Sequence, residues 1–206
     1  MENRRRLRER LELPDELPPT SAFFPDAGQI YLRTSWDVDA EMITFDATRE
    51  ASAHNHLGAN SLQLHAHGRT LLMDPGFLTY HMGHAGGTEL DNIAGPYGKG
   101  TRAHNTLNLN GWNQWMISPE WTRHWAVDGA DAIASRYAGG YWPGPYGWWF
   151  YEGGGHGLAA THDRLVYWVH HRFAVVVDTM MRWNEEVHGD KAHQYPFAEA
   201  NWQLCP

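Results

Sequence analysis

The chain has 206 residues, which is enough for one large or two small domains and for a single β-sandwich with a substantial core. Its 24 acidic residues outnumber its 16 basic ones, and five of the basic residues are arginines within the first ten positions. This balance excludes a nucleic-acid or anionic-membrane binder held by a broad basic face. The single cysteine, Cys205, excludes an internal disulfide framework, and no apolar run approaches the roughly 20 residues of a membrane span.

The N-terminal segment differs in composition from the rest of the chain. Residues 2–12 are predominantly charged and predict a short helix, and the proline-rich run 13–19 that follows would end it. A helix of eleven residues with charge on all sides is marginal on its own, which is typical of a linker. We therefore expect a charged linker at residues 1–22 and one folded domain at residues 23–206.

The sequence pattern of the remainder of the chain predicts short strands. Segments of alternating apolar and polar residues, bounded by Gly, Asp and Pro, predict strands at 29–33, 41–45, 60–66, 69–74, 105–110, 121–127, 132–137, 164–170 and 173–178. Gly68 would turn the third strand into the fourth, and Asp74, Pro75 and Gly76 would close that hairpin. No helical periodicity competes, so the fold class is all-β, a large antiparallel β-sandwich with long loops at 79–100 and 137–155.

Histidine is over-represented, with 14 residues against two lysines. His54 and His56 are two residues apart, which on an extended chain places both imidazoles on one face. Asp74 closes the hairpin and His104 opens another predicted strand. Two imidazoles and a carboxylate from separate strands would suit zinc and conceivably ferrous iron, while the alternative is a set of hydrogen-bonded histidines at strand ends. His170 and His171 lie at a strand end and are expected to be structural.

Two further features admit two interpretations each. The loop 137–155 contains eight aromatic residues and seven glycines, which favours either a platform for sugar rings or an internally packed loop. Four arginines are candidate partners for substrate carboxylates, although structural ion pairs explain most such residues better. These are Arg33, Arg102, Arg123 and Arg164.

An ordered series of short motifs resembles one known family. The chain is similar to the C-terminal β-sandwich of the heparinase II/III family of polysaccharide lyases, which includes alginate and oligo-alginate lyases and has a supersandwich-like fold. The matching motifs run from about Phe23 to His193. They are Phe24-Pro25-Asp26-Ala27-Gly28, Arg33-Thr34-Ser35-Trp36-Asp37, His54-x-His56, Asn60-Ser61-Leu62-Gln63-Leu64, Gly68-Arg69-x-Leu71-Leu72-x-Asp74-Pro75-Gly76, Ala103-His104-Asn105-Thr106-Leu107 and Arg164 with Val176-Val177-Asp178.

The resemblance implies roles for four of these residues. His56, Asp74 and His104 match the family's zinc ligands, and the zinc would be structural, bracing the wall of the cleft. His54 matches a histidine that faces the substrate and takes part in catalysis, as the base or as a partner of the sugar carboxylate.

The chain also departs from the family pattern. Gly58 stands where an acidic residue is common, which removes a carboxylate that could orient a ligand imidazole, and this loss could loosen the metal site. The family's N-terminal α/α toroid, which supplies further catalytic residues, has no counterpart in this sequence, so we expect the chain to lack that partner domain and to be incomplete as an enzyme.

The favoured function is therefore a carbon–oxygen lyase domain that cleaves a uronic-acid-containing polysaccharide or oligosaccharide by β-elimination. The main alternative is a non-catalytic carbohydrate-binding or metal-stabilised β-sandwich module. A small metalloenzyme with a two-histidine, one-carboxylate site is a third possibility. By resemblance the protein would be periplasmic or secreted, although no signal peptide is visible in the sequence.

Overall fold

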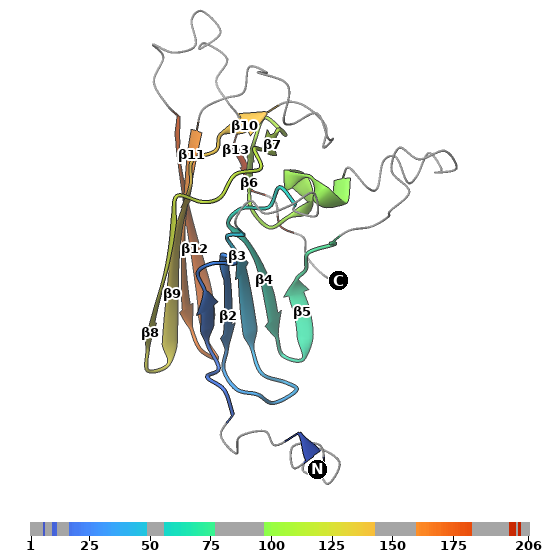
Figure 1. The fold of residues 1–206 in the computed structure, drawn as a ribbon, viewed down its shortest axis with the longest axis vertical. Coiled ribbons are helices and arrows are strands. Elements are labelled where there is room, and N and C mark those ends of the chain that lie inside the picture. The colour runs from blue at the N-terminus through green and yellow to red at the C-terminus, as the bar shows by residue number, and fades with distance from the viewer. Residues whose placement is uncertain are drawn as a thin grey trace, which may run out of the picture.

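The structure is a computed structural model of the chain. It describes residues 6, 10–11, 17–48, 56–76, 97–142, 160–182, 198–200 and 202. Two antiparallel sheets stand face to face along the long axis of the molecule, and smaller elements gather at their upper end (Figure 1). None of the helices in these residues is long and apolar enough to cross a membrane.

The first sheet is a meander in which each strand pairs with the next along the chain. Its strands are β1 (Ala22–Phe24), β2 (Gln29–Arg33), β3 (Met42–Asp46), β4 (Ser61–Ala66) and β5 (Arg69–Leu72), in the order β1-β2-β3-β4-β5. His67 and Gly68 connect β4 to β5 with positive φ angles of 54° and 69°. A two-residue turn with both φ angles positive matches the twist of the flanking strands, which confirms the hairpin predicted at Gly68.

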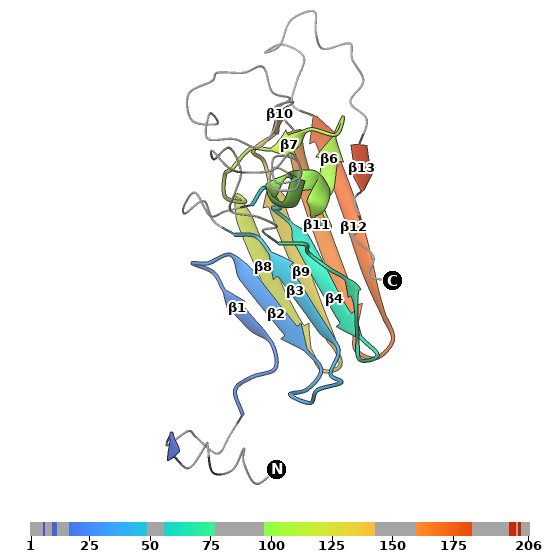
Figure 2. The same cartoon turned by 90° about the vertical axis from the view of Figure 1, so that its right-hand side faces the viewer.

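The second sheet has four longer strands. They are β8 (Trp121–Val127), β9 (Ala130–Tyr137), β11 (Ala160–Val169) and β12 (Phe173–Arg182), in the order β12-β11-β9-β8. Asp128 and Gly129 join β8 to β9, and Val127 pairs with Ala130 across this tight turn. Figure 2 shows the second sheet behind the first, with the strands of both running in similar directions.

The core lies between the inner faces of the two sheets. Alternate residues of each strand point inward, as the period of two requires. The first sheet contributes Ile30, Leu32, Ile43, Phe45 and Leu62, and the second contributes Ile133, Val166 and Trp168. All of them are at most 3% exposed. Burial of each such side chain contributes about 1.5–3 kcal/mol, so this layer holds the sheets together.

Short elements close the upper end of the sandwich (Figure 1). The 3₁₀ turn η1 (Thr101–Ala103) leads into β6 (Leu107–Leu109), which pairs with β13 (Ala198–Ala200). The strand β7 (Asn113–Gln114) pairs with β10 (Tyr141–Trp142). A second apolar cluster of Leu109, Tyr137, Tyr141 and Ala160 packs beneath these strands.

At the opposite end of the second sheet, a buried carboxylate connects residues from neighbouring strands. Asp131 is 3% exposed, and its two oxygens lie 2.7 Å from His124 Nε2 and 2.7 Å from His170 Nε2. Trp168 packs on the His170 ring with centroids 4.5 Å apart. This arrangement gives His170 the structural role predicted for it.

The structure confirms the predicted fold class. All nine predicted strands correspond to observed strands, with ends that shift by up to four residues at the N-terminus of β11 and the C-terminus of β12. Of the predicted helix at 2–12, Arg6 and Arg10 are helical, and most of the segment lies outside the described residues. The linker boundary at residue 22 stays a prediction.

Candidate metal centre and cleft

The structure brings His56, Asp74 and His104 together from three separate segments. His56 precedes β4, Asp74 follows β5, and His104 follows η1. One ligand atom from each residue lies within 4.8 Å of the others. His104 Nδ1 is 2.6 Å from Asp74 Oδ2, and the His56 and His104 rings have centroids 5.3 Å apart. Two imidazoles and a carboxylate at this spacing form a donor set suited to zinc.

An unsatisfied polar atom supports the same interpretation. His104 is 2% exposed, and its Nε2 has no hydrogen-bond partner among the described residues. A buried ring nitrogen without a partner is costly unless something else occupies it. His54, the predicted catalytic residue, lies outside the described residues, so its position relative to this group stays a prediction.

Side-chain hydrogen bonds to backbone carbonyls hold the ligand-bearing segments in place. Asn105 Nδ2 donates to the carbonyls of Leu62 and Met73, both at 2.9 Å, which fixes the loop after His104 to β4 and to the residue before Asp74. Thr101 Oγ1 donates to the carbonyl of Leu57 at 2.7 Å and thereby holds the residue after His56. The spacing of the three candidate ligands therefore follows from buried backbone contacts.

Gly58 packs directly against the ring of His104. A Cβ at this position would lie 2.8 Å from His104 Cγ and 3.0 Å from Cδ2, closer than real Cβ contacts allow. The φ angle of Gly58 lies outside the left-handed region, so the need for glycine here is steric and does not come from backbone strain. In this chain the glycine places the backbone close enough to confine the imidazole.

The lowered pKa values of His56 and Asp74 favour metal binding. Burial lowers the pKa of His56, and the charges of His104 and Lys99 lower it further against the opposing charge of Asp74. Burial alone would raise the pKa of Asp74, but the hydrogen bond and charge of His104 outweigh it, so the Asp74 pKa is lowered. A neutral imidazole and an ionised carboxylate are the forms that bind a metal.

A cleft of about 290 Å³ opens beside the group on the outer face of the first sheet. Its lining includes His56, Asp74 and His104 together with Gln29, Thr44, Asp46, Thr48, Ser61, Leu62 and Gln63. Asp46, which the sequence analysis did not single out, accepts hydrogen bonds from the backbone and hydroxyl of Thr48. Burial nevertheless raises the Asp46 pKa and so favours its neutral form.

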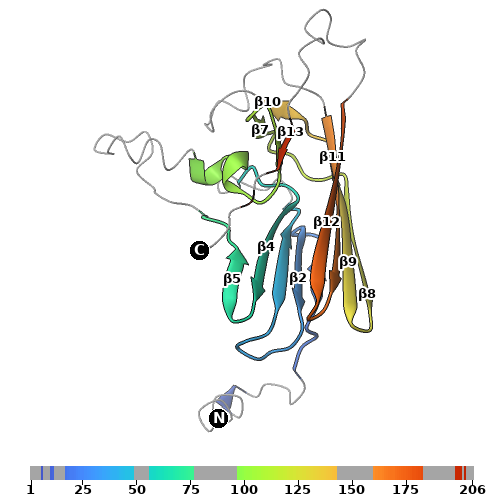
Figure 3. The same cartoon turned by 180° about the vertical axis from the view of Figure 1, so that it is seen from behind.

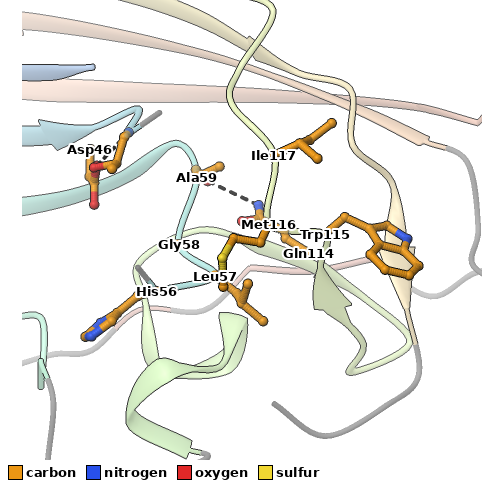
Figure 4. Close-up of a pocket in the computed structure, with 10 residues that line it drawn as sticks. Asp46, His56, Leu57, Gly58, Ala59, Gln114, Trp115, Met116 and Ile117 are labelled. Atoms are coloured by element: carbon orange, nitrogen blue, oxygen red, sulfur yellow. Dashed lines mark hydrogen bonds between the residues drawn. The ribbon is translucent and has the colours of Figure 1, made fainter. Parts of the chain in front are cut away.

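A smaller pocket of about 20 Å³ adjoins this cleft (Figure 4). Asp46 and His56 lie on one side of it, and Trp115 and Ile117 lie on the other. Gln114 Nε2 donates to the carbonyl of Ala59 at 3.1 Å in its wall. The cleft is therefore mostly polar, and the adjoining pocket has Trp115 and Ile117 in its wall.

A buried ion pair lies behind the group. Arg164 is 1% exposed and donates from Nε and Nη2 to the two carboxylate oxygens of Asp178, at 2.7 and 2.9 Å. Its Nη1 donates to the backbone carbonyls of Asn60 and Asn105. His162 Nε2 lies 2.8 Å from the same Asp178 carboxylate. Arg164 is therefore structural, and the alternative in which it binds a substrate carboxylate is wrong.

The other three candidate arginines have different surroundings. Arg33 donates from Nε to the carbonyl of Ser35 and stacks over Trp36, and Arg123 stacks over Trp121 on the second sheet. Arg102 lies in η1 near Gly111. None of the three lines the described cleft. Most of the aromatic loop 137–155 lies outside the described residues, so both interpretations of it stay open.

The fold and the site together define a β-sandwich domain with a candidate metal centre at one end of its first sheet. The chain belongs to the Heparinase II/III-like, C-terminal family, whose model matches residues 16–206. No curated protein matches the sequence.

Solved structures share the fold at low sequence identity. The heparan sulfate lyase HepC from Pedobacter heparinus is 19% identical with a TM-score of 0.63, and the match covers 84% of this chain and 23% of that one. A heparinase III is 20% identical with a TM-score of 0.60 over 79% of this chain and 23% of that chain. A heparinase III with methylated lysines is 20% identical with a TM-score of 0.64, and the match covers 89% of this chain and 27% of that one. The chain thus spans about a quarter of the length of these proteins.

Replacement of Gly58 by alanine should destabilise the fold by forcing the His104 ring out of position. We expect Gly58→Ala to lower the free energy of unfolding by about 1–3 kcal/mol, as overpacking of a buried site does, measured by urea denaturation. In a His104→Ala background the same substitution should cost much less, because the ring is absent. An equal loss in both backgrounds would contradict this account of Gly58.

The buried His162 should make stability depend on pH. Burial lowers its pKa although Asp178 opposes the shift, so the unfolded chain binds the proton more readily than the folded chain. Stability contributed by neutral His162 is full above its unfolded pKa of about 6.5 and is lost as the pH falls below it. A second loss follows between about pH 4 and pH 2, because Asp178 has a pKa of about 2.

Urea denaturation at pH values from about 7.5 down to about 5, a range that brackets the ordinary histidine pKa, measures the first effect. We expect His162→Gln to flatten the profile and the exposed control His67→Gln to leave it unchanged. Parallel profiles for wild type and His162→Gln would show that His162 does not contribute.

Proposed function

We propose that this chain is the β-sandwich portion of an eliminative lyase that acts on a uronic-acid-containing polysaccharide. The observation that supports it best is the polar cleft on the first sheet, with two imidazoles and a carboxylate gathered on its wall. Membership of the Heparinase II/III-like family supports the reaction class.

The reaction sets clear physical demands on such a cleft. A lyase removes the weakly acidic proton alpha to the sugar carboxylate and expels the oxygen beta to it. The site must neutralise that carboxylate, accept the proton at a positioned base and stabilise the charge that develops. His54, by its place in the His54-x-His56 motif, is the residue we propose as the base or as the partner of the carboxylate.

We further propose that His56, Asp74 and His104 hold a zinc ion with a structural role. A divalent ion there would offset the charge of Asp74, which otherwise opposes an acidic polymer in the cleft. It would also replace the contact between His104 and Asp74 by bonds that join all three ligand segments. The residues of the chain then present a fixed wall, with Asp46, whose pKa is raised by burial, beside it.

Zinc should stabilise the folded chain through these three residues. At a free concentration about one hundred times its dissociation constant, zinc should add about 2.7 kcal/mol to the free energy of unfolding. Isothermal titration should show one ion per chain and much weaker binding for Asp74→Asn. His65→Ala, a half-buried histidine outside the set, serves as the control and should bind as wild type. Equal affinity in Asp74→Asn and wild type would exclude this site.

Lyase activity is tested by incubating the chain with alginate, heparan sulfate and hyaluronan and following the ultraviolet absorbance of an unsaturated uronate. In at least one of two arms, the first of which uses the chain alone, we expect the absorbance to rise with at least one polymer. The rate in that arm should fall at least about tenfold for His54→Ala, since general acid–base catalysis contributes 10²–10⁴-fold. Because the chain spans a quarter of the solved lyases, a second arm uses it joined to any upstream polypeptide that its gene encodes.

The small share of the solved proteins that this chain covers also supports one alternative, a non-catalytic binding module. A chain that matches 23–27% of the solved proteins could bind a uronic-acid polymer without cleaving it. Binding without product in both arms of the assay would favour this non-catalytic module over a lyase.

A further inference from the structure

The outer face of the second sheet carries a continuous set of exposed apolar side chains. Nine large residues on β8, β11 and β12 are between 37% and 68% exposed. They form what we call the outer apolar face: Trp121, Trp125, Val127, Leu165, Tyr167, Phe173, Val175, Val177 and Met181. No described element lies beyond β8 and β12 on this side in Figures 1 and 3.

The strand register arranges these residues in rows across the sheet. One row runs from Trp125 through Ala132 and Tyr167 to Val175. The next runs from Arg123 through Ala134 and Leu165 to Val177. Each row has a small alanine on β9 between larger side chains on both sides. A low strip therefore follows β9, and a raised strip of Leu165 and Tyr167 follows β11 beside it.

The size of the face is that of a protein interface. With full side-chain areas of about 150–250 Å² for aromatic residues, the exposed fractions correspond to roughly 800 Å². The largest apolar patch on a typical monomer is about 300–600 Å², and a standard interface buries about 800 Å² on each partner. Five of the nine residues are aliphatic and lack the flat ring faces on which sugars stack, so this large apolar patch favours a protein partner over sugar rings.

Charge is nearly absent from the face. On the outward positions of these strands the charged residues are Arg123, Arg136 and Asp163, and the last two form an ion pair at 2.6 Å. The chain as a whole has a net charge of −8, so its surplus of acidic residues lies outside this face. The face therefore allows close approach of a second copy without burying an unpaired acid.

We propose that the outer apolar face is a symmetric interface between two copies of this chain. A twofold axis in the interface, parallel to the strands and between β9 and β11, places Leu165 and Tyr167 of each copy over the alanine strip of the other. The same axis places β8 over the partner's β12, and the two sheets pack face to face at the usual separation of about 10 Å. The cleft lies on the outer face of the first sheet, so it stays open in the dimer.

Sedimentation equilibrium of the whole chain tests this proposal. We expect a mass twice that of the 23.5 kDa chain, with a dissociation constant of about 1 μM or below, as interfaces of this size provide. The double variant Leu165→Lys/Val175→Lys should raise that constant at least tenfold, because lysines would be buried without partners. Ala132→Trp should do the same without charge, by filling the alanine strip.

Val38→Lys is the matched control, since Val38 is 90% exposed but lies outside the face. It should leave the mass unchanged, and near-ultraviolet circular dichroism should confirm that every variant is folded. A wild-type chain that stays monomeric at about 100 μM, or a dimer that survives both face variants, would overturn the proposal. So would a monomer whose tryptophan fluorescence changes with uronate oligosaccharides and loses that change in Trp125→Ala, because the face would then be a sugar platform.

Discussion

The buried ion pair between Arg164 and Asp178 is the contact on which the rest of the structure depends. The pair joins β11 to β12, and Arg164 also donates to the carbonyls of Asn60 and Asn105 on the other side of the sandwich. Four of its five N–H groups are thus engaged without water. Removal of one partner from such a pair costs about 3–5 kcal/mol, since the other charge stays buried. Because Asn105 follows His104, the position of the candidate metal centre depends on this pair.

Much of the fold could be predicted from the sequence because alternation in a strand is a local property. The predicted strands correspond to observed strands, and a glycine between two alternating segments predicted the turn at Gly68. The short strands β1, β7, β10 and β13 were missed. Two or three residues are too few to show a period, and the pairing of β13 with β6 joins residues about 90 positions apart. Such contacts are decided by tertiary packing.

The sequence predicted the candidate metal ligands, but it did not predict the buried contacts that hold them in place. His56, Asp74 and His104 were assigned through a resemblance, and the structure places them together. The motifs around Asn60 and Asn105 and the pair of Arg164 with Asp178 were recognised as a pattern without a physical reason. The structure gives the physical reason: Arg164 donates hydrogen bonds to the carbonyls of Asn60 and Asn105 in the core. Spacing along the chain does not reveal such contacts. Asp46 was missed because a single aspartate at the end of a strand gives no signal of a cleft.

The position of Gly58 illustrates how a chain can fix an imidazole in two ways. An acidic residue near a ligand histidine orients the ring by a hydrogen bond. In this chain Asp74 already supplies an acceptor for the ring of His104, since its Oδ2 lies 2.6 Å from Nδ1. A larger residue at position 58 would collide with the same ring, so the backbone of Gly58 confines it from one side. Steric contact with Gly58 and the contact with Asp74 therefore both limit the movement of the His104 ring. The expectation that Gly58 loosens the metal site stays a prediction, because zinc held by Asp74 and His104 would replace the contact between these two residues.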